Sequence, residues 1–325
     1  MTADSLAASA EGVVARVDFN ACAVLLDDGA LLATTVRPRL MGRRKALGNT
    51  VVVGDRVRCE TLGEAVSIVE VAPRRNAFSR RASGRQPVEQ VVGANLDQVL
   101  VVAAFADPEF SAGFTDRVLC QAEHAGLPAR LLLNKVDLAE ATPAGRAEVR
   151  ALVDDYARAG YAVHAMSART GAGIEELRQV CRGHRSLFVG HSGVGKSTLL
   201  NALVPGLDLL VGRVNAKTGK GRHTTTAAWL VRPEPGFELI DTPGMRAFGL
   251  WGIEPRTLDQ AWAEFRPFLG ACRFADCAHG GEPGCAVSEA VDAGRVAARR
   301  LGSYRKLREE LEQEAAPPSS REGTW

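Results

Sequence analysis

Apolar and polar residues follow two different patterns along the chain. Over roughly the first 70 residues, short apolar segments recur without a helical period and predict about five strands. The six apolar segments are residues 13–17, 23–26, 31–34, 51–53, 57–59 and 67–69. Asp28-Gly29 separates two of them and signals a hairpin, because both residues tolerate positive φ. A small closed β-barrel has this size, and we predict a barrel of the OB type.

After Asn95, buried apolar strands alternate with helices. We expect strands at residues 98–104, 129–133, 162–165, 186–189 and 237–240. Helices are expected at residues 114–125, 144–159 and 174–181, from Lys196 onward, and at 303–313. This βαβ succession requires a mostly parallel sheet with helices on both faces.

These patterns predict a multidomain α/β protein. Residues 73–87 combine five Arg with Ser, Gly, Asn and Pro, which is typical of an exposed linker. The expected division is an OB-type β-barrel over 1–75, a basic linker over 76–92, an α/β domain over 93–250, a helical domain over 251–314 and a flexible tail over 315–325.

The charge of one segment is more informative than the net charge of the whole chain. Of the 325 residues 46% are hydrophobic and 24% are charged, which excludes wholesale disorder, and the formal net charge of +2 predicts no partner. Between Val36 and Arg85, however, there are twelve basic residues and only four acidic ones. Such a run is either a plain solvated surface or a surface for a polyanion.

Neither a leader nor a membrane span is expected. The N-terminus has no basic segment before an apolar core, and the longest apolar run, residues 99–106, has eight residues against the ~20 of a membrane helix. Seven cysteines without a secretory signal argue against a disulfide framework. We therefore expect a cytoplasmic protein.

Residues 190–198 form a complete P-loop pattern, directly after an expected strand and at the start of a helix. The pattern consists of Gly190, His191, Ser192, Gly193, Val194, Gly195, Lys196, Ser197 and Thr198. Its glycines let backbone N–H groups surround phosphates, Lys196 reaches the β- and γ-phosphates, and Ser197 offers a hydroxyl to Mg²⁺. The strand, loop, Lys-Ser pair and helix together favour this interpretation over a plain Gly-rich turn.

Asp241-Thr242-Pro243-Gly244 ends a later apolar strand. A carboxylate there can hold the water shell of Mg²⁺, and Gly244 can offer its N–H to a γ-phosphate. Between this motif and the P-loop lies a threonine trio. One of its hydroxyls could bind Mg²⁺ only when the γ-phosphate is present, which makes the segment a candidate switch. Our candidate is Thr225, with Thr224 and Thr226 as alternatives.

Asn134-Lys135-Val136-Asp137 follows the strand at 129–133 and has the NKxD pattern of a guanine site. The Asp137 carboxylate can accept hydrogen bonds from guanine N1–H and the 2-amino group, which adenine cannot donate, while Lys135 packs along the base. Ser167-Ala168, after the next strand, can bring a backbone N–H to guanine O6. These motifs predict GTP as the nucleotide.

The order of the motifs is unusual. Ordinary small G domains begin with the P-loop and end with NKxD and Ser-Ala, whereas here residues 134–137 and 167–168 precede residues 190–198 and 241–244. Circular permutation produces such an order, because the termini of compact domains often lie close together. The segment after Gly244 then leads directly to the cysteine-rich end of the chain.

With the barrel, residues 93–98, the segment Gly221-Arg222-His223-Thr224-Thr225-Thr226 and the cysteine pattern, this order resembles the circularly permuted, small-ribosomal-subunit-dependent GTPases of the RsgA/YjeQ family. The resemblance covers nearly the whole chain. It implies an OB-fold, a permuted P-loop GTPase domain and a zinc domain. It also implies GTP hydrolysis stimulated by the 30S subunit, in late 30S maturation. We expect a monomer that binds the 30S subunit and its 16S rRNA with GTP and is released on hydrolysis to GDP.

Catalysis has an unusual feature. Met245 stands where a Ras-like enzyme has a water-orienting Gln, so we expect slow hydrolysis by the free protein. His223 matches the family's His-Thr-Thr and is, with Lys196, the candidate catalytic residue. A histidine that merely faces phosphate or RNA is the alternative. Gly193 stands where P-loops with a K⁺ ion often carry Asn, so no K⁺ site is predicted.

Cys272, Cys277, His279 and Cys285 offer three thiolates and one imidazole within fourteen residues. That ligand set suits a closed, tetrahedral, structural Zn²⁺ site. Because the spacing departs from the usual CxxC pairs, a reduced loop or redox-sensing thiols remain open on the residues alone. The family resemblance favours one structural zinc.

Beside a nucleotide switch, the basic run of the barrel points to RNA phosphates. Only Phe19 and Phe78 are aromatic in the first 90 residues, which disfavours base stacking. The candidate contacts are Arg37, Arg39, Arg43, Arg44 and Lys45. Two alternatives stay open: an rRNA-binding scaffold regulated by nucleotide, in which hydrolysis is incidental, and an ATP-using P-loop enzyme.

Overall fold

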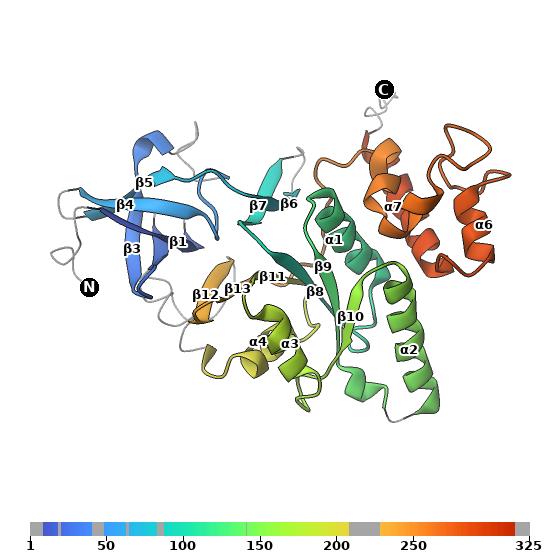
Figure 1. The fold of residues 1–325 in the computed structure, drawn as a ribbon, viewed down its shortest axis with the longest axis horizontal. Helices are drawn as coiled ribbons and strands as arrows, with labels where there is room; N and C mark the ends of the chain where they lie inside the picture. Colours follow the sequence, from blue (N-terminus) through green and yellow to red (C-terminus); the bar gives the residue numbers. More distant parts are fainter. Residues whose placement is uncertain are drawn as a thin grey trace, which may run out of the picture.

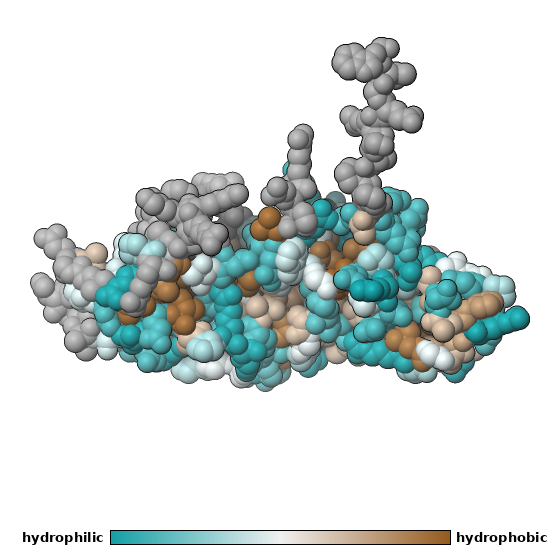
Figure 2. Space-filling model, turned by 90° about the horizontal axis from the view of Figure 1, so that it is seen from above, coloured by the Kyte–Doolittle hydropathy of each residue, from teal (hydrophilic) through white to brown (hydrophobic). Residues whose placement is uncertain are grey.

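The computed structural model describes residues 9–18, 21–40, 49–62, 65–82, 88–140, 142–207 and 228–315. Three units follow one another along its longest axis: a strand barrel, an α/β layer and a small helical unit (Figure 1). Seen from above, the surface is mostly hydrophilic, and apolar residues are exposed in small separate patches (Figure 2). Within the described ranges, no helix combines the length and the apolarity needed to cross a membrane.

The predicted OB-type barrel is confirmed. Its strands are β1 (Ser9–Val17), β2 (Cys22–Leu26), β3 (Leu31–Val36), β4 (Arg56–Leu62) and β5 (Ala65–Val71), and the short 3-10 helix η2 (Pro38–Leu40) follows β3. The strand order β1-β2-β3-β5-β4 closes through a β1–β4 pairing. Gly29, with φ 85°, forms the predicted turn between β2 and β3. Alternating side chains such as Val14, Val24 and Ile68 fill the interior.

The strand predicted at residues 51–53 is wrong. Val51, Val52 and Val53 are buried, but they lie in a turn rather than in a ladder. Gly54 reverses the chain with φ 94°, and the backbone N–H of Ala94 donates to the carbonyl of Val53 at 3.0 Å. Val53 packs in the core that includes the α/β domain, and Val51 packs in the barrel core, so these residues are apolar without pairing in the barrel ladder.

Residues 77–81 are not an exposed linker, contrary to our expectation. They form β6 (Ala77–Arg81), which pairs antiparallel with β7 (Glu89–Ala94). Phe78 is fully buried, and its ring centroid lies 5.7 Å from that of Phe248. One aromatic side chain in the core and a hydrogen-bonded partner strand thus outweigh a local composition that is typical of a linker.

The α/β domain has the predicted, mostly parallel sheet. Its strands are β8 (Gln98–Ala104), β9 (Ala129–Asn134), β10 (Ala162–Ala165), β11 (Arg185–Gly190), β12 (Trp229–Glu234) and β13 (Phe237–Asp241). They lie in the order β10-β9-β8-β11-β13-β12, with β12 antiparallel at the end. Arg16 of β1 pairs with Trp229 of β12, so the barrel and the sheet are joined by hydrogen bonds.

Helices cover both faces of this sheet because successive residues of its buried strands point to opposite sides. Val99, Val101 and Leu131 pack with α1 (Ala112–His124) and α2 (Pro143–Arg158). Leu100 and Leu132 pack with α3 (Ile174–Cys181) and α4 (Lys196–Leu203) on the other face. Side-chain oxygens of residues 111 and 142 cap α1 and α2, respectively.

The C-terminal unit is helical, as predicted. It contains the 3-10 helices η4 (Pro255–Ala261) and η5 (Ala263–Phe268), followed by α6 (Ala286–Asp292) and α7 (Ala298–Ala315). Trp262, Phe265 and Tyr304 form its aromatic centre. Arg300 of α7, also buried, bonds to Asp116 of α1, so this unit is fixed to the helical layer of the α/β domain.

Candidate functional site

Four predicted motifs meet at the carboxyl edge of the parallel sheet. Gly190 pairs with Val102, Ala104 pairs with Asn134, and Asp241 pairs with Phe188 in parallel registers, so the carboxyl ends of these strands face the same edge of the sheet. In open α/β sheets, ligands bind in the crevice beyond the carboxyl ends of the strands. The P-loop, residues 134–137, residues 167–168 and residues 241–244 thus come together although they are far apart in the sequence.

The P-loop glycines meet specific steric demands. Gly193 and Gly195 both have φ 86°, which favours glycine. A Cβ on Gly195 would lie 2.6 Å from the side-chain nitrogen of Asn134, and one on Gly190 would lie 2.8 Å from the carbonyl oxygen of Val102. The loop therefore packs directly against β8 and the NKxD motif, with its open side at the start of α4.

Lys196 and Asp241 form a buried ion pair in the middle of the site. The Lys196 ammonium donates to a carboxylate oxygen of Asp241, and the two side chains are only 6% and 5% exposed. Burial raises the pKa of Asp241, while the ammonium opposes this shift. Ser197 and Thr198 are exposed beside this pair, in the first turn of α4.

Asn134 joins three motifs. Its buried side-chain amide donates to the carbonyl of Val194 at 2.9 Å and accepts a hydrogen bond from the backbone N–H of Ala168 at 3.0 Å. Lys135, with φ 63°, donates from its ammonium to the Gly193 carbonyl at 2.9 Å. Its aliphatic stem therefore spans the gap between the NKxD motif and the P-loop.

Asp137 stands in η3 (Val136–Leu138), with its carboxylate 6% exposed. It accepts a hydrogen bond of 2.5 Å from the Ser167 hydroxyl. The guanidinium of Arg169 donates to the other oxygen, from Nε at 2.9 Å and from a terminal nitrogen at 2.6 Å. The hydroxyl, followed by the guanidinium, lowers the pKa of Asp137. Sequence reasoning missed Arg169, although its place directly after Ser-Ala was a signal.

Gly244 and Met245 link the end of β13 to the P-loop. The Met245 N–H donates to the Gly190 carbonyl at 3.1 Å, and the Ser192 N–H donates to the Met245 carbonyl at 3.2 Å. A Cβ on Gly244 would lie 3.2 Å from Cα of Ser192. His191 packs edge-on against Phe114 at 5.6 Å. The motif at 241–244 and the P-loop are thus in direct contact.

Several predicted residues lie outside the described part of the chain. These are His223, Thr224, Thr225, Thr226, Arg43, Arg44, Lys45 and the side chain of Arg39. Arg37 is described: it is half-buried, and its guanidinium lies 3.8 Å from the carboxylate of Glu60.

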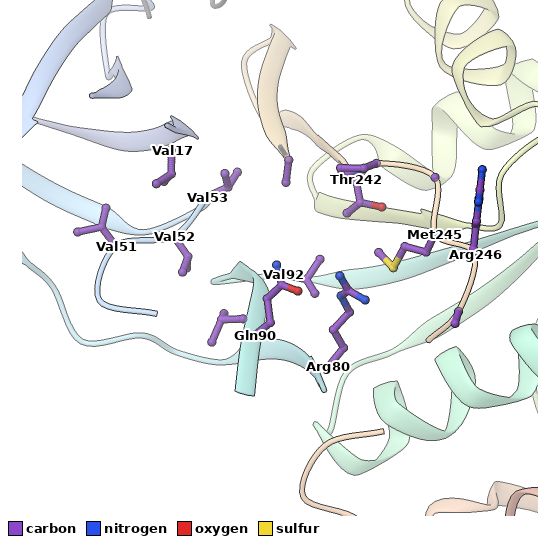
Figure 3. Close-up of a pocket in the computed structure, with 15 residues that line it drawn as sticks. Val17, Val51, Val52, Val53, Arg80, Gln90, Val92, Thr242, Met245 and Arg246 are labelled. Atoms are coloured by element: carbon purple, nitrogen blue, oxygen red, sulfur yellow. The ribbon is translucent and has the colours of Figure 1, made fainter. Parts of the chain in front are cut away.

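Carboxylates neutralise much of the basic run. Its arginines with an acidic partner are Arg37, Arg56, Arg58, Arg74, Arg75 and Arg81. Arg80 has none within the described residues, and burial lowers its pKa. It points into a cavity of about 520 Å³ between the barrel valines, β7 and residues 242–247 (Figure 3). An unpaired, half-buried guanidinium thus lies near the motif at the end of β13.

The C-terminal cluster fits a tetrahedral metal ion. One ligand atom from each of Cys272, Cys277, His279 and Cys285 lies within 4.8 Å of all the others. Nδ1 of His279 is 3.7, 3.7 and 3.4 Å from the three sulfurs. Bond lengths of about 2.3 Å for Zn–S and 2.05 Å for Zn–N at tetrahedral angles give a separation of about 3.6 Å. The donor set and its spacing are those of a closed zinc site.

Neighbouring groups support this cluster. Nε2 of His279 is buried and lies 3.7 Å from the Asp259 carboxylate, which leaves Nδ1 to face the thiols. The Glu282 carboxylate accepts hydrogen bonds from the N–H groups of Ala278 and Gly281 at 2.8 and 3.0 Å. Burial tends to raise the pKa of Cys285, but hydrogen bonds with Ser288, His279 and Cys277 outweigh it and lower the value to about 7. The loop is therefore organised to present a thiolate.

The other four cysteines are buried free thiols: Cys22, Cys59, Cys120 and Cys181. Burial raises the pKa of Cys22 to about 12 and that of Cys59 to about 11. Buried thiols with raised pKa values are chemically inert core residues.

The sequence model of the RsgA GTPase family matches residues 71–251. The small ribosomal subunit biogenesis GTPase RsgA of Gemmatimonas aurantiaca is 45% identical over 308 residues, which cover 93% of this chain and 98% of that protein. The protein of the same name from Azotobacter vinelandii is 44% identical over 283 residues, covering 86% of this chain and 80% of that protein.

Two solved structures are similar along almost the whole chain. YjeQ from Thermotoga maritima matches with a TM-score of 0.72 and 32% sequence identity, covering 94% of this chain and 99% of that one. YloQ, described as a circularly permuted GTPase, matches in fold with a TM-score of 0.68 and 23% identity, covering 95% of this chain and 97% of that one.

Proposed function

Because the chain belongs to the RsgA GTPase family, and is thus a GTP-hydrolysing enzyme, we propose that it binds GTP at the carboxyl edge of the sheet and acts in late maturation of the 30S ribosomal subunit. One observation carries the nucleotide site. Asn134 bonds to the P-loop at Val194 and to the Ser-Ala motif at Ala168, so motifs in permuted order contact one another at one edge of the sheet.

Guanine recognition is assigned to Asp137. The carboxylate accepts from N1–H and from the 2-amino group of guanine, while the stem of Lys135 supports the base and the region of Ser167 and Ala168 faces O6. The low pKa of Asp137 supports this role, because only the ionised carboxylate accepts both hydrogen bonds. Adenine has no matching donors, which gives the preference for GTP over ATP.

The phosphates are assigned to residues 190–198. Backbone N–H groups of the loop and the N-terminus of α4 bind the phosphate oxygens, and Lys196 contacts the β- and γ-phosphates. A Mg²⁺ ion supplies charge neutralisation between these phosphates, and oxygens of Ser197, Asp241 and a threonine among residues 224–226 suit it as ligands. Lys196 must then exchange its bond to Asp241 for the phosphates.

Slow hydrolysis in the free protein follows from Met245. The residue is buried and lines the cavity beside β6 and β7, and its thioether cannot orient an attacking water. We propose that 30S binding completes the site, with His223 as the residue that acts on the water. In this scheme the GTP-bound monomer binds the subunit in the cytoplasm, and hydrolysis releases it.

The Cys₃His cluster is assigned to one structural Zn²⁺. All four ligand positions are protein atoms, so no position remains for catalysis. The ion would hold η4, η5 and α7 together against α1.

For the 16S rRNA we propose the basic part of the barrel, with Arg37, Arg39, Arg43, Arg44 and Lys45 as contacts. Because acidic partners neutralise many described arginines, the unpaired charges should dominate binding. Phosphate contacts release counterions, so affinity for 30S particles should fall steeply with salt. Binding that is insensitive to salt contradicts this surface.

The decisive experiment compares GTP turnover by the zinc-loaded protein with and without purified 30S subunits. We expect stimulation by 30S, and a variant His223→Ala should bind GTP but lose that stimulation. A rate unaffected by 30S supports instead an rRNA-binding scaffold in which hydrolysis is incidental.

Base recognition is tested by Asp137→Asn. The variant should shift preference from guanosine to xanthosine nucleotides, because the amide presents a donor where the carboxylate accepts. Asp154→Asn, an exposed carboxylate of α2, is the matched control and should keep the guanosine preference. If Asp137→Asn binds GTP like the parent protein, the assignment of the base site is wrong.

A further inference from the structure

The carboxylate proposed to read guanine already has most of its acceptor positions in use. One oxygen of Asp137 accepts from the Ser167 hydroxyl, and the other accepts two hydrogen bonds from the Arg169 guanidinium. A carboxylate has about four lone-pair positions, so these three bonds leave about one. Guanine needs two, one for N1–H and one for the 2-amino group. The Asp137 carboxylate therefore cannot bind guanine while it keeps all three hydrogen bonds from Ser167 and Arg169.

Arg169 is the donor that can leave. Its side chain is 73% exposed and stands on the loop between β10 and α3. Ser167 is 1% exposed, and its backbone and hydroxyl are held by Ala172 and Thr170 in the same turn. An exposed arginine is released into water at little cost, whereas the buried serine keeps its place.

Arg169 also resembles the base edge in its chemistry. Nε–H and a terminal N–H of a guanidinium form a planar fork of two parallel donors, which is the same pattern that N1–H and the 2-amino group of guanine present to a carboxylate.

We propose that Arg169 is an internal competitor of guanine for Asp137, which weakens guanine-nucleotide binding and speeds GDP release. This rests on the proposed function, in which Asp137 reads guanine. When the base leaves, Arg169 binds the carboxylate in its place, so the Asp137 carboxylate stays hydrogen-bonded before and after the exchange. The arginine thus lowers the cost of losing the nucleotide.

The size of the effect follows from the exposure of Arg169. Arg169 is largely in solvent although Asp137 is not, and a pair with such a solvated cation corresponds to roughly a two- to five-fold change in an equilibrium constant. We therefore expect Arg169→Ala to bind GDP and GTP roughly two- to five-fold more tightly, mainly through slower dissociation.

The test is stopped-flow dissociation of a ribose-labelled fluorescent GDP from the full, zinc-loaded chain. Arg182→Ala is the matched control: Arg182 is also exposed and has a carboxylate partner, Glu234 at 3.3 Å, but it does not touch Asp137. It removes the same charge and should leave the GDP dissociation rate unchanged. Arg169→Lys keeps the charge without the fork and should fall between the parent protein and Arg169→Ala.

Salt gives a second readout. Screening weakens the Arg169–Asp137 pair, so the difference between the parent protein and Arg169→Ala should shrink as salt rises from 0.05 to 0.5 M. Faster or unchanged GDP dissociation in Arg169→Ala, or an equal change in Arg182→Ala, would overturn the proposal.

The base-site role of Asp137 and the competitor role of Arg169 are tested separately. If Asp137→Asn keeps the guanosine preference, the assignment of the base site fails and the competition fails with it. If Asp137→Asn shifts to xanthosine nucleotides while Arg169→Ala dissociates GDP like the parent protein, only the competitor role of Arg169 is wrong.

Discussion

Replacing Arg300 with methionine should destabilise the protein by about 3–5 kcal/mol, the usual cost of removing one partner from a buried ion pair. Arg300 is 1% exposed. Its guanidinium donates to the Glu264 carboxylate at 2.6 and 3.0 Å and to Asp116 at 2.5 Å, and it lies 4.5 Å from the ring centroid of Trp262. Methionine keeps the stem but leaves two buried carboxylates without a positive charge.

The cost is high because little else can replace the arginine. The second carboxylate oxygen of Asp116 has no hydrogen-bond partner among the described residues, and the first is shared only with the Tyr156 hydroxyl at 2.7 Å. Arg299→Met is the matched control from the preceding position. Its guanidinium is 40% exposed and 3.6 Å from Asp155, so its loss should cost less than about 1 kcal/mol.

The assay is urea unfolding of the zinc-loaded chain, followed by tryptophan fluorescence, which includes Trp262 next to the guanidinium. The triple variant Arg300→Met, Asp116→Asn, Glu264→Gln should recover part of the loss, because it removes the unpaired charges. If Arg300→Met and Arg299→Met unfold within about 1 kcal/mol of each other, the reasoning from burial is refuted. If the triple variant is no more stable than Arg300→Met, uncompensated charge is not the cause.

Three further variants probe other parts of the molecule. Asn134→Ala leaves the Val194 carbonyl and the Ala168 N–H unbonded, which should cost about 1–3 kcal/mol in urea unfolding and lower GTP affinity at least tenfold by fluorescence titration. Cys285→Ala should bind less than one zinc per chain by elemental analysis. In the parent protein, zinc retention should fall in acid, because protons compete with the ion for the three thiolates. Gly54→Ala, at φ 94°, places a Cβ 2.2 Å from a backbone carbonyl oxygen. It should lower the free energy of unfolding by about 1–2 kcal/mol or more, measured by thermal melting.

Much of the fold was predictable because its signals are local. The hairpin at Asp28-Gly29, the alternation of strands and helices after Asn95 and the P-loop each depend on residues close together in the chain. The circular permutation could be predicted for the same reason. Each motif is recognised from a few consecutive residues, so the order of the motifs can be read without knowing their positions in space. The OB-type barrel and the mostly parallel sheet confirm that part.

The errors have one cause. Val53 is apolar because it packs in the core that includes the α/β domain, Val51 because it packs inside the barrel, and Phe78 is buried because Phe248 lies against it. A pattern along the chain reports that a residue is buried or exposed, but it does not name the surface that buries it. Residues 51–53 were therefore predicted as a strand and residues 77–81 as part of a linker, although the local pattern was plausible in both cases.

The order of amino acids specifies which chemical groups the protein has: the phosphate loop, the guanine-type carboxylate and the four metal ligands. Their pairing depends on how the chain folds. The fold places Arg169 on Asp137, Lys196 on Asp241, and Arg300 on a carboxylate 184 positions away. Charge pairing depends on distance in space and on exclusion of water, and neither quantity is encoded in spacing along the chain.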